Sequence, residues 1–201
     1  MKNRHIISII LAILAFFTSS AFADTSVTNK YQVSLTKFEL FNSGTNQWVT
    51  LYEGNSVTLD IASVSVNQAV GNFMSGLSVP DGTYTKARAT PSTTFVIKGS
   101  VTSGGTTYYT TATTLASGGR TVSSASTTAS DEADCTIAIL TTDVAPNTDG
   151  VSFSSPLTIT DGNPNKKIRV KFDLSNTLVY VAAGPNNLVY PGPPTVTMTL
   201  E

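Results

Sequence analysis

The side chains that most often carry catalysis are scarce in this chain. Its only histidine, His5, lies in the N-terminal segment 1–23, and its only cysteine is Cys135. Histidine is the usual proton carrier near neutral pH and the commonest nitrogen ligand of metals. Serine and threonine are abundant, but no Gly-x-Ser-x-Gly motif is present, and no local pattern supports a Ser–Lys pair built on Lys86 or Lys98. We therefore expect a protein that is not an enzyme.

Clustered carboxylates are the remaining option for acid–base chemistry. Asp131, Glu132 and Asp134 lie together in a polar segment without aromatic neighbours. Glycoside hydrolysis needs two carboxyl groups held at a set distance in a cleft. A solvated acidic turn explains these residues better, so a carboxylate-dependent hydrolase is the third hypothesis for function.

Partial calcium-loop patterns are the only metal signals, one at 161–165 and a second partial match at 147–150. Asp161, Asn163 and Asn165 supply oxygen ligands at positions 1, 3 and 5 of such a loop. Lys166 stands where the loop needs Gly, and Phe172 stands where it needs Glu. Asp-Gly and Asn-Pro are also ordinary turn sequences. Calcium is thus the one cofactor that the sequence suggests. The alternative is an ordinary turn that binds no cofactor.

Aromatic residues offer a possible carbohydrate platform. Tyr108 and Tyr109 are consecutive, so a strand would point one ring to each face. Flat rings stack on sugar faces, and Trp48 could join them. A tryptophan such as Trp48 is more often a core residue or a cover for the sheet.

The first 23 residues read as a secretory signal peptide. A positive start precedes an apolar run at 6–17 and a small-x-small cleavage site that ends at Ala23. The run is too short to span a bilayer. We expect an exported mature chain of 201 − 23 = 178 residues that starts at Asp24 and has no transmembrane segment. Periplasm, cell surface and medium all remain open as its destination.

The charge balance argues against nucleic acid as a partner. Two of the 12 basic residues, Lys2 and Arg4, leave with the signal, so the mature net charge is 10 − 13 = −3. The largest basic cluster, at 166–171, alternates along a predicted strand and does not form a continuous basic stripe. We expect partners among proteins or polysaccharides at the cell surface.

Period-two hydrophobic patterns dominate the chain after Asp24. They predict short strands at 31–41, 47–52, 56–61, 84–90, 94–101, 106–115, 135–141, 151–159, 166–173, 177–182 and 195–200. A one-residue phase shift near Thr36 and Lys37 predicts a β-bulge in the first strand. Cys135 heads an apolar strand, where we expect it to be buried as a small hydrophobe; an intermolecular disulfide is the alternative.

Two segments depart from this pattern. Apolar residues at helical spacing predict one short helix at 62–77. The Ser/Thr/Gly-rich segment 118–130 is predicted to be a long loop. Together the patterns predict a single domain over 24–201: an all-β antiparallel β-sandwich, transthyretin-like or Ig-like, with one short helix and a Ser/Thr/Gly-rich insertion around 102–134.

A turn at Pro80-Asp81-Gly82 is expected to deliver Tyr84 into the sheet. Proline fixes φ at the first central position, and Gly82 accepts a positive φ that other residues resist.

Several of these motifs resemble those of a known family when they are taken in order. They are Val33-x-Leu35-x-x-Phe38-Glu39-Leu40, Trp48-Val49-Thr50-Leu51, Thr58-Leu59-Asp60, Pro80-x-Gly82-x-Tyr84-Thr85-x-x-Arg88 and Phe172-Asp173-Leu174-Ser175. The chain resembles a family of secreted bacterial domains of unknown function with a transthyretin-like (prealbumin-like) sandwich. The resemblance covers about 31–101 and, more loosely, 166–200. It implies a fold and an exported location, but no activity.

Three functions follow as hypotheses. The first is a non-catalytic exported β-sandwich that acts as an extracellular or envelope adhesion, matrix or assembly module. The second is a carbohydrate-binding module that uses Tyr108, Tyr109 and Trp48. The third is the carboxylate-dependent hydrolase. Coplanar exposed rings would favour the second, an uncovered apolar edge strand the first, and a cleft with facing carboxylates the third.

Overall fold

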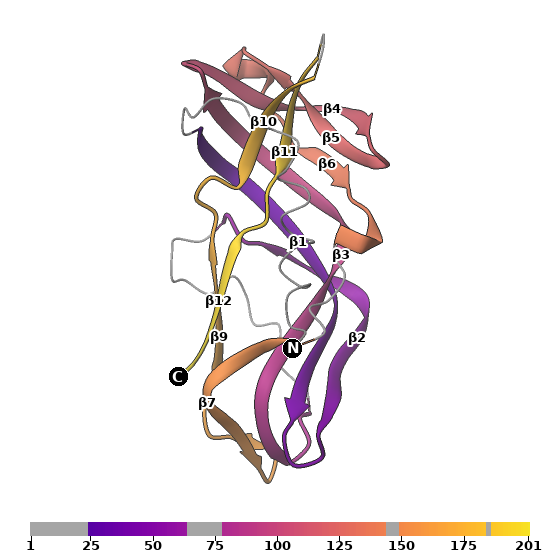
Figure 1. The fold of residues 1–201 in the computed structure, drawn as a ribbon, viewed down its shortest axis with the longest axis vertical. Coiled ribbons are helices and arrows are strands. Elements are labelled where there is room, and N and C mark those ends of the chain that lie inside the picture. Colours follow the sequence, from indigo (N-terminus) through magenta and orange to yellow (C-terminus); the bar gives the residue numbers. More distant parts are fainter. Residues whose placement is uncertain (1–23, 64–77, 144–148, 184–185) are drawn as a thin grey trace, which may run out of the picture.

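The computed structural model describes residues 24–63, 78–143, 149–183 and 186–201 (Figure 1). The expected signal peptide at 1–23 lies outside the described residues, and so does nearly all of the expected helix at 62–77.

The described residues form antiparallel β-structure with two short 3-10 helices, which confirms the all-β sandwich. The strands are β1 Thr25–Asn42, β2 Gln47–Asp60, β3 Gly82–Ser103, β4 Thr106–Ser117, β5 Arg120–Ser126, β6 Cys135–Ala138, β7 Val151–Thr160, β8 Asn163–Pro164, β9 Ile168–Asp173, β10 Leu178–Ala183, β11 Asn186–Pro191 and β12 Thr195–Leu200. The 3-10 helices are η2 Ala129–Asp131 and η3 Thr141–Asp143.

Two long strands, β1 and β3, run side by side through both halves of the elongated molecule (Figure 1). The large sheet has the order β10-β11-β5-β4-β3-β1-β2. Along its length β3 changes its second partner, from β7 to β6 to β4. Strand β8 pairs with β7, and β9 with β12 forms a separate two-stranded sheet. The long strands therefore join an upper and a lower half.

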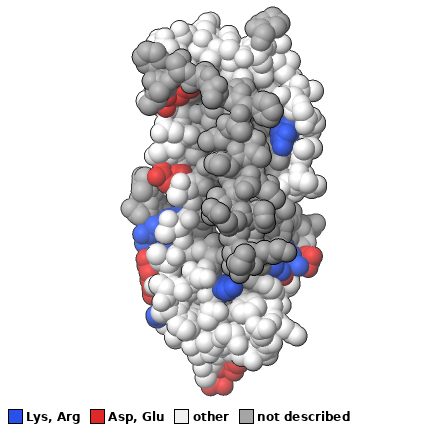
Figure 2. Space-filling model, in the orientation of Figure 1, with Lys and Arg blue, Asp and Glu red and all other residues white. Residues whose placement is uncertain are grey.

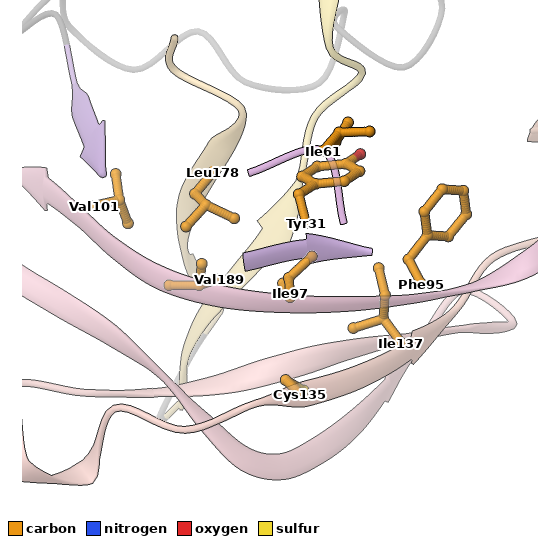
Figure 3. Packing of buried hydrophobic residues seen from close by; sticks show 9 residues of the cluster. All are labelled: Tyr31, Ile61, Phe95, Ile97, Val101, Cys135, Ile137, Leu178 and Val189. Carbon is orange, nitrogen blue, oxygen red and sulfur yellow. The ribbon is translucent and has the colours of Figure 1, made fainter. Parts of the chain in front are cut away.

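Each half has its own hydrophobic core. The upper core gathers side chains from β1, β3, β6, β10 and β11 and from the turn that follows β2 (Figure 3): Tyr31, Ile61, Phe95, Ile97, Val101, Cys135, Ile137, Leu178 and Val189. The lower core contains Phe38, Leu40, Tyr84, Ala87, Leu157 and Ile159. Cys135 has no exposed surface, so its expected burial is confirmed.

The expected bulge in β1 is present where the two halves meet. The pairing of β1 with both β2 and β3 shifts between Leu35 and Lys37. A bulge inserts a residue and bends the strand, so the residues beyond it continue with a new phase. Phe38 and Leu40 thereby reach the lower core.

The same bulge explains two wrong predictions of strand breaks. We expected separate strands at 47–52 and 56–61 and at 84–90 and 94–101, but β2 and β3 are each continuous through Gly54 and Pro91. Leu35 pairs with Val57 and Lys37 with Glu53, so the extra residues of β2 are absorbed in an irregular stretch of the ladder. Pro91 lies opposite Leu35 at this irregularity, where a missing N–H is tolerated.

The expected loop at 118–130 is also wrong, because it contains β5. Gly118 and Gly119, with φ of 58° and 80°, turn the chain from β4 into β5. The Ser123 hydroxyl is buried in this strand, where it accepts a hydrogen bond from the Thr111 amide at 2.9 Å. A polar strand can thus enter the sheet when its hydroxyls find backbone partners. Strand β11 was not expected either.

The chain bends before β3 and Gly82 has a positive φ, as expected, but Gly82 is itself the first residue of β3 and not a central residue of a turn. Gly82 has φ +156°, and a Cβ there would lie 2.6 Å from Asn42 Nδ2. Tyr84 is fully buried, and its hydroxyl donates a hydrogen bond to the Pro80 carbonyl at 2.8 Å. A tyrosine that bonds back to the backbone a few residues upstream is a known device of sandwich folds.

Candidate functional site

The ring of Tyr108 is stacked against another protein ring. Its centroid lies 3.9 Å from that of Tyr180 of β10, with an angle of 16° between the planes. Hydrogen bonding with Tyr108 is the main cause that raises the pKa of Tyr180 to about 12, with smaller contributions from burial, from the charge of Tyr108 and from Asp24. The Tyr180 hydroxyl also donates to Asn187 Oδ1 at 2.7 Å. Tyr180 therefore covers one face of Tyr108.

Trp48 is engaged in the other half of the molecule. The Arg88 guanidinium carbon lies 4.2 Å from the centroid of a Trp48 ring, and Phe41 meets that ring edge-on at 5.3 Å. Gly150 packs so close that a Cβ on it would lie 2.5 Å from Trp48 Cη2. A cation over the indole face stabilises this arrangement.

The three aromatic residues do not form one platform. Tyr108 pairs with Val101, whose partner on β1 is Ser26, whereas Trp48 pairs with Phe41 of β1. Ser26 and Phe41 are 15 residues apart, roughly 50 Å along an extended strand. Tyr109 follows Tyr108 on β4 and is half-buried. A single sugar ring therefore cannot contact Tyr108 and Trp48 together.

The residues of the calcium pattern lie in the β7–β8 hairpin. Asp161 and Gly162 have φ of 51° and 72°, as the central residues of a two-residue hairpin turn require. The Asn163 side chain donates to the Asp161 carbonyl at 2.9 Å, and Asn165 Oδ1 accepts from the Thr158 amide at 2.9 Å. These side chains hold the turn, so the hairpin accounts for the pattern, and bound calcium stays a prediction.

A carboxylate from another part of the chain completes this hairpin. Asp81 accepts hydrogen bonds from the amides of Asp161 and Gly162 at 3.0 and 2.9 Å. The turn before β3 and the β7–β8 turn are thus tied together. In the described part of the chain, no group of three or more His, Cys, Asp or Glu side chains could hold a metal ion.

The clustered carboxylates of Asp131, Glu132 and Asp134 each contact a different partner. Asp131 accepts from the Ser126 hydroxyl at 2.6 Å, and Glu132 accepts from the Asn29 side chain at 2.7 Å. Asp134 pairs with Lys30 at 2.5 Å. Each contact fastens this segment to a neighbouring strand, so the cluster does not face one substrate position.

A buried ion pair that the sequence did not reveal lies on the sheet face opposite the lower core. The Glu39 side chain is 6% exposed, and its oxygens lie 2.5 Å from Arg88 Nε and 3.3 Å from Lys37 Nζ. The hydrogen bond from Arg88 is the main cause that lowers the pKa of Glu39. Thr50 also donates to Glu39 at 3.3 Å. Cross-strand register alone brings these residues together.

The outer edge of β10 is the feature best suited to contact another molecule. All six residues of β10 pair with β11, and Leu178 pairs with Pro191, which has no N–H. The Leu178 amide instead donates to Ser26 Oγ at 3.3 Å, away from β11. Residues two apart in a strand point their backbone groups the same way. The N–H and C=O of Tyr180 and Ala182 therefore also point away from β11.

This edge lacks the usual protection. β10 reads Leu-Val-Tyr-Val-Ala-Ala, without charge or proline, and within the described ranges no other strand pairs with its outer side. The opposite edge of the large sheet, β2, carries the exposed Glu53 and an irregular stretch at Gly54. Charges and bulges protect sheet edges from unwanted pairing. By this criterion the edge of β2 is protected against pairing with another strand, and the edge of β10 is not.

On the face shown in Figure 2, the described residues carry few charged side chains, and their Lys and Arg groups are scattered among Asp and Glu groups without a large patch of one sign. Among the described residues, no helix has the length and apolar character to cross a membrane. No family model, curated protein or solved structure matches the chain, so its resemblance to the secreted transthyretin-like family stays a prediction.

Proposed function

We propose that this protein is a non-catalytic, exported β-sandwich that works by surface contact, as an adhesion, matrix or assembly module outside the cytoplasm. The observation that carries the proposal is the open edge of β10, a strand without a charged residue. Export is inferred from the segment 1–23, whose pattern is that of a signal peptide.

An open edge strand favours contact with another extended chain. Its outward N–H and C=O groups, at Tyr180 and Ala182, can bond an added strand, and flanking side chains then set the specificity. The apolar side chains of β10 add burial without separating any charge from water. The arrangement supports this mode better than sugar stacking, because Tyr108 and Trp48 are far apart and each is packed against neighbouring groups.

A charge placed on the edge tests the proposal. Ala182→Lys adds a protective charge at an exposed residue of β10, and Ala112→Lys adds the same charge at an exposed residue of β4. Both variants should export and melt like the wild type. We expect Ala182→Lys to be released into the medium as free protein, while Ala112→Lys and the wild type stay with the envelope or matrix fraction. Equal retention of all three would contradict the proposal.

A further inference from the structure

We propose that the strand that completes the β10 edge is β10 of a second copy of this chain, paired antiparallel about a two-fold axis at Val181. This inference rests on the proposed function and names its partner.

The directions of the backbone groups allow this pairing. Tyr180 and Ala182 both point their N–H and C=O groups outward, and they flank Val181. When two copies meet about Val181, Tyr180 of each copy lies opposite Ala182 of the other. Each such pair exchanges two hydrogen bonds, so four bonds form and no outward group of these residues is left over. The two Val181 residues then form a close pair without hydrogen bonds of its own.

The side chains also match a second copy. β10 itself has no charged residue, so no like charges lie opposite each other within the two paired strands. A charged group near this ladder is Asp24, which acts on Tyr180. Val179 and Val181 lie on one face of β10 and are half-buried in the single copy. In the pair, the valines of both copies become neighbours on one continuous face. A charged partner strand would instead place its charges against these apolar side chains.

The contact is short, which predicts weak pairing between free molecules. The Leu178 amide is already bonded to Ser26, so two residues of each copy supply the ladder. Four net backbone hydrogen bonds correspond to a dissociation constant on the order of 1 mM at best, because association also costs translational and rotational freedom. Such contacts hold well when many copies are concentrated on a surface, as in a matrix or array. The test must therefore trap a transient pair.

Disulfide trapping tests the register of the two β10 strands directly. In the pair, the two Val181 residues face each other at a separation that suits a disulfide. The two Val179 residues would lie four residues apart, about 13 Å, which is too far. We compare Val181→Cys with Val179→Cys, a neighbour on the same face of β10, under mild oxidation. The chain starts at Asp24 and carries any tag after Glu201, because Asp24 lies close enough to Tyr180 to affect its pKa.

We expect Val181→Cys to form disulfide-linked dimers at least about tenfold faster than Val179→Cys, since disulfide formation depends steeply on geometry. The wild type, whose Cys135 is buried, should form none. Melting curves confirm that both variants are folded. No dimer from folded Val181→Cys, or equal rates at both positions, would overturn the second-copy inference.

The result can be separated from the test of the proposed function. If Val181→Cys fails to cross-link while Ala182→Lys still loses retention, a different strand fills the edge, and the proposed function stands without this inference. If Val181→Cys cross-links while Ala182→Lys is fully retained, the pairing stands and the proposed function fails.

Discussion

At the scale of single residues, Gly82 determines how the chain enters β3. Its φ of +156° lies in a region that side chains with a Cβ rarely adopt, and a Cβ would meet Asn42 Nδ2 at 2.6 Å. Gly82→Val should therefore destabilise the fold by about 2–3 kcal/mol, from backbone strain and from displacement of Asn42. Denaturant unfolding measures this loss.

Gly54→Val is the matched control for Gly82→Val. Gly54 has φ +150°, but a Cβ there would meet no atom within 4 Å. Its substitution isolates the backbone strain, which we expect to cost about 1 kcal/mol. If Gly82→Val were no more costly than Gly54→Val, the close packing of Asn42 against this turn would be refuted.

Glu39 is expected to make the protein sensitive to acid. Arg88 lowers its pKa in the folded state, so the protein gains stability from Glu39 above its unfolded pKa of about 4.3 and loses it as the pH falls through the folded value. Glu39→Gln should cost about 2–4 kcal/mol at pH 7, because Arg88 loses a buried partner, and should flatten the loss of stability below pH 4.3.

Unfolding in urea between pH 7 and pH 3 tests this expectation. The control is Glu53→Gln, which removes an exposed partner of Lys37 and should change stability by less than about 0.5 kcal/mol. A Glu39→Gln variant that loses stability with acid as steeply as the wild type would show that another carboxylate dominates.

At the scale of elements, β10 carries two classes of backbone amide. The Val181 amide points to β11, and the Ala182 amide points outward. Val181→Pro removes a ladder hydrogen bond and should cost about 1–3 kcal/mol. Ala182→Pro removes only an outward donor and should change stability by less than about 1 kcal/mol, since proline is tolerated on the free side of edge strands. Thermal melting compares the two. Equal losses would mean that the assignment of the outer side is wrong.

The strands whose pattern is local could be predicted from the sequence, and so could the bulge. The phase shift at Thr36 and Lys37 is a property of neighbouring residues, and it appears in the pairing of β1. The continuity of β2 and β3 depends instead on their partner. Pro91 reads as a strand breaker, but it is tolerated because Leu35 lies opposite it at an irregular point of the ladder.

The candidate site was predicted even less completely, because long-range register creates it. Glu39 and Arg88 are 49 residues apart, and nothing in either local sequence marks them as partners. The open edge of β10 depends on which strands lie beside it, and β11 itself was missed. One signal was available: Leu178–Ala183 has neither charge nor proline, which is unusual for an edge strand.

At the scale of the whole molecule, the upper half is closed by contacts between distant segments. Tyr31 of β1 lies in the upper core, and its hydroxyl donates to the Gly192 carbonyl, between β11 and β12, at 3.1 Å. Burial raises the pKa of Tyr31 to about 12, from an unfolded value of about 10. The stability that the neutral phenol supplies is complete below pH 10 and lost as the pH rises to about 12.

Alkaline unfolding tests this closure. The wild type should lose roughly 3 kcal/mol through Tyr31 between pH 10 and 12, which corresponds to a shift of two pKa units. Tyr31→Phe should cost about 1 kcal/mol at neutral pH but show a shallower alkaline loss. If the stability of Tyr31→Phe fell as steeply between pH 10 and 12 as that of the wild type, the role given to Tyr31 would be contradicted.

β10 has an open edge, and we propose that another strand fills it. Hydrogen exchange, measured for individual amides by NMR in dilute and in concentrated solutions of the chain from Asp24, tests it most directly. In dilute solution the amides of Tyr180 and Ala182 should exchange rapidly, and those of Val179 and Val181 slowly, because only the latter are bonded to β11. In concentrated solution Tyr180 and Ala182 should gain protection while Val179 and Val181 keep theirs. If Tyr180 and Ala182 were already as protected as Val181 in dilute solution, the edge would be closed within one molecule, and no further strand could pair with it.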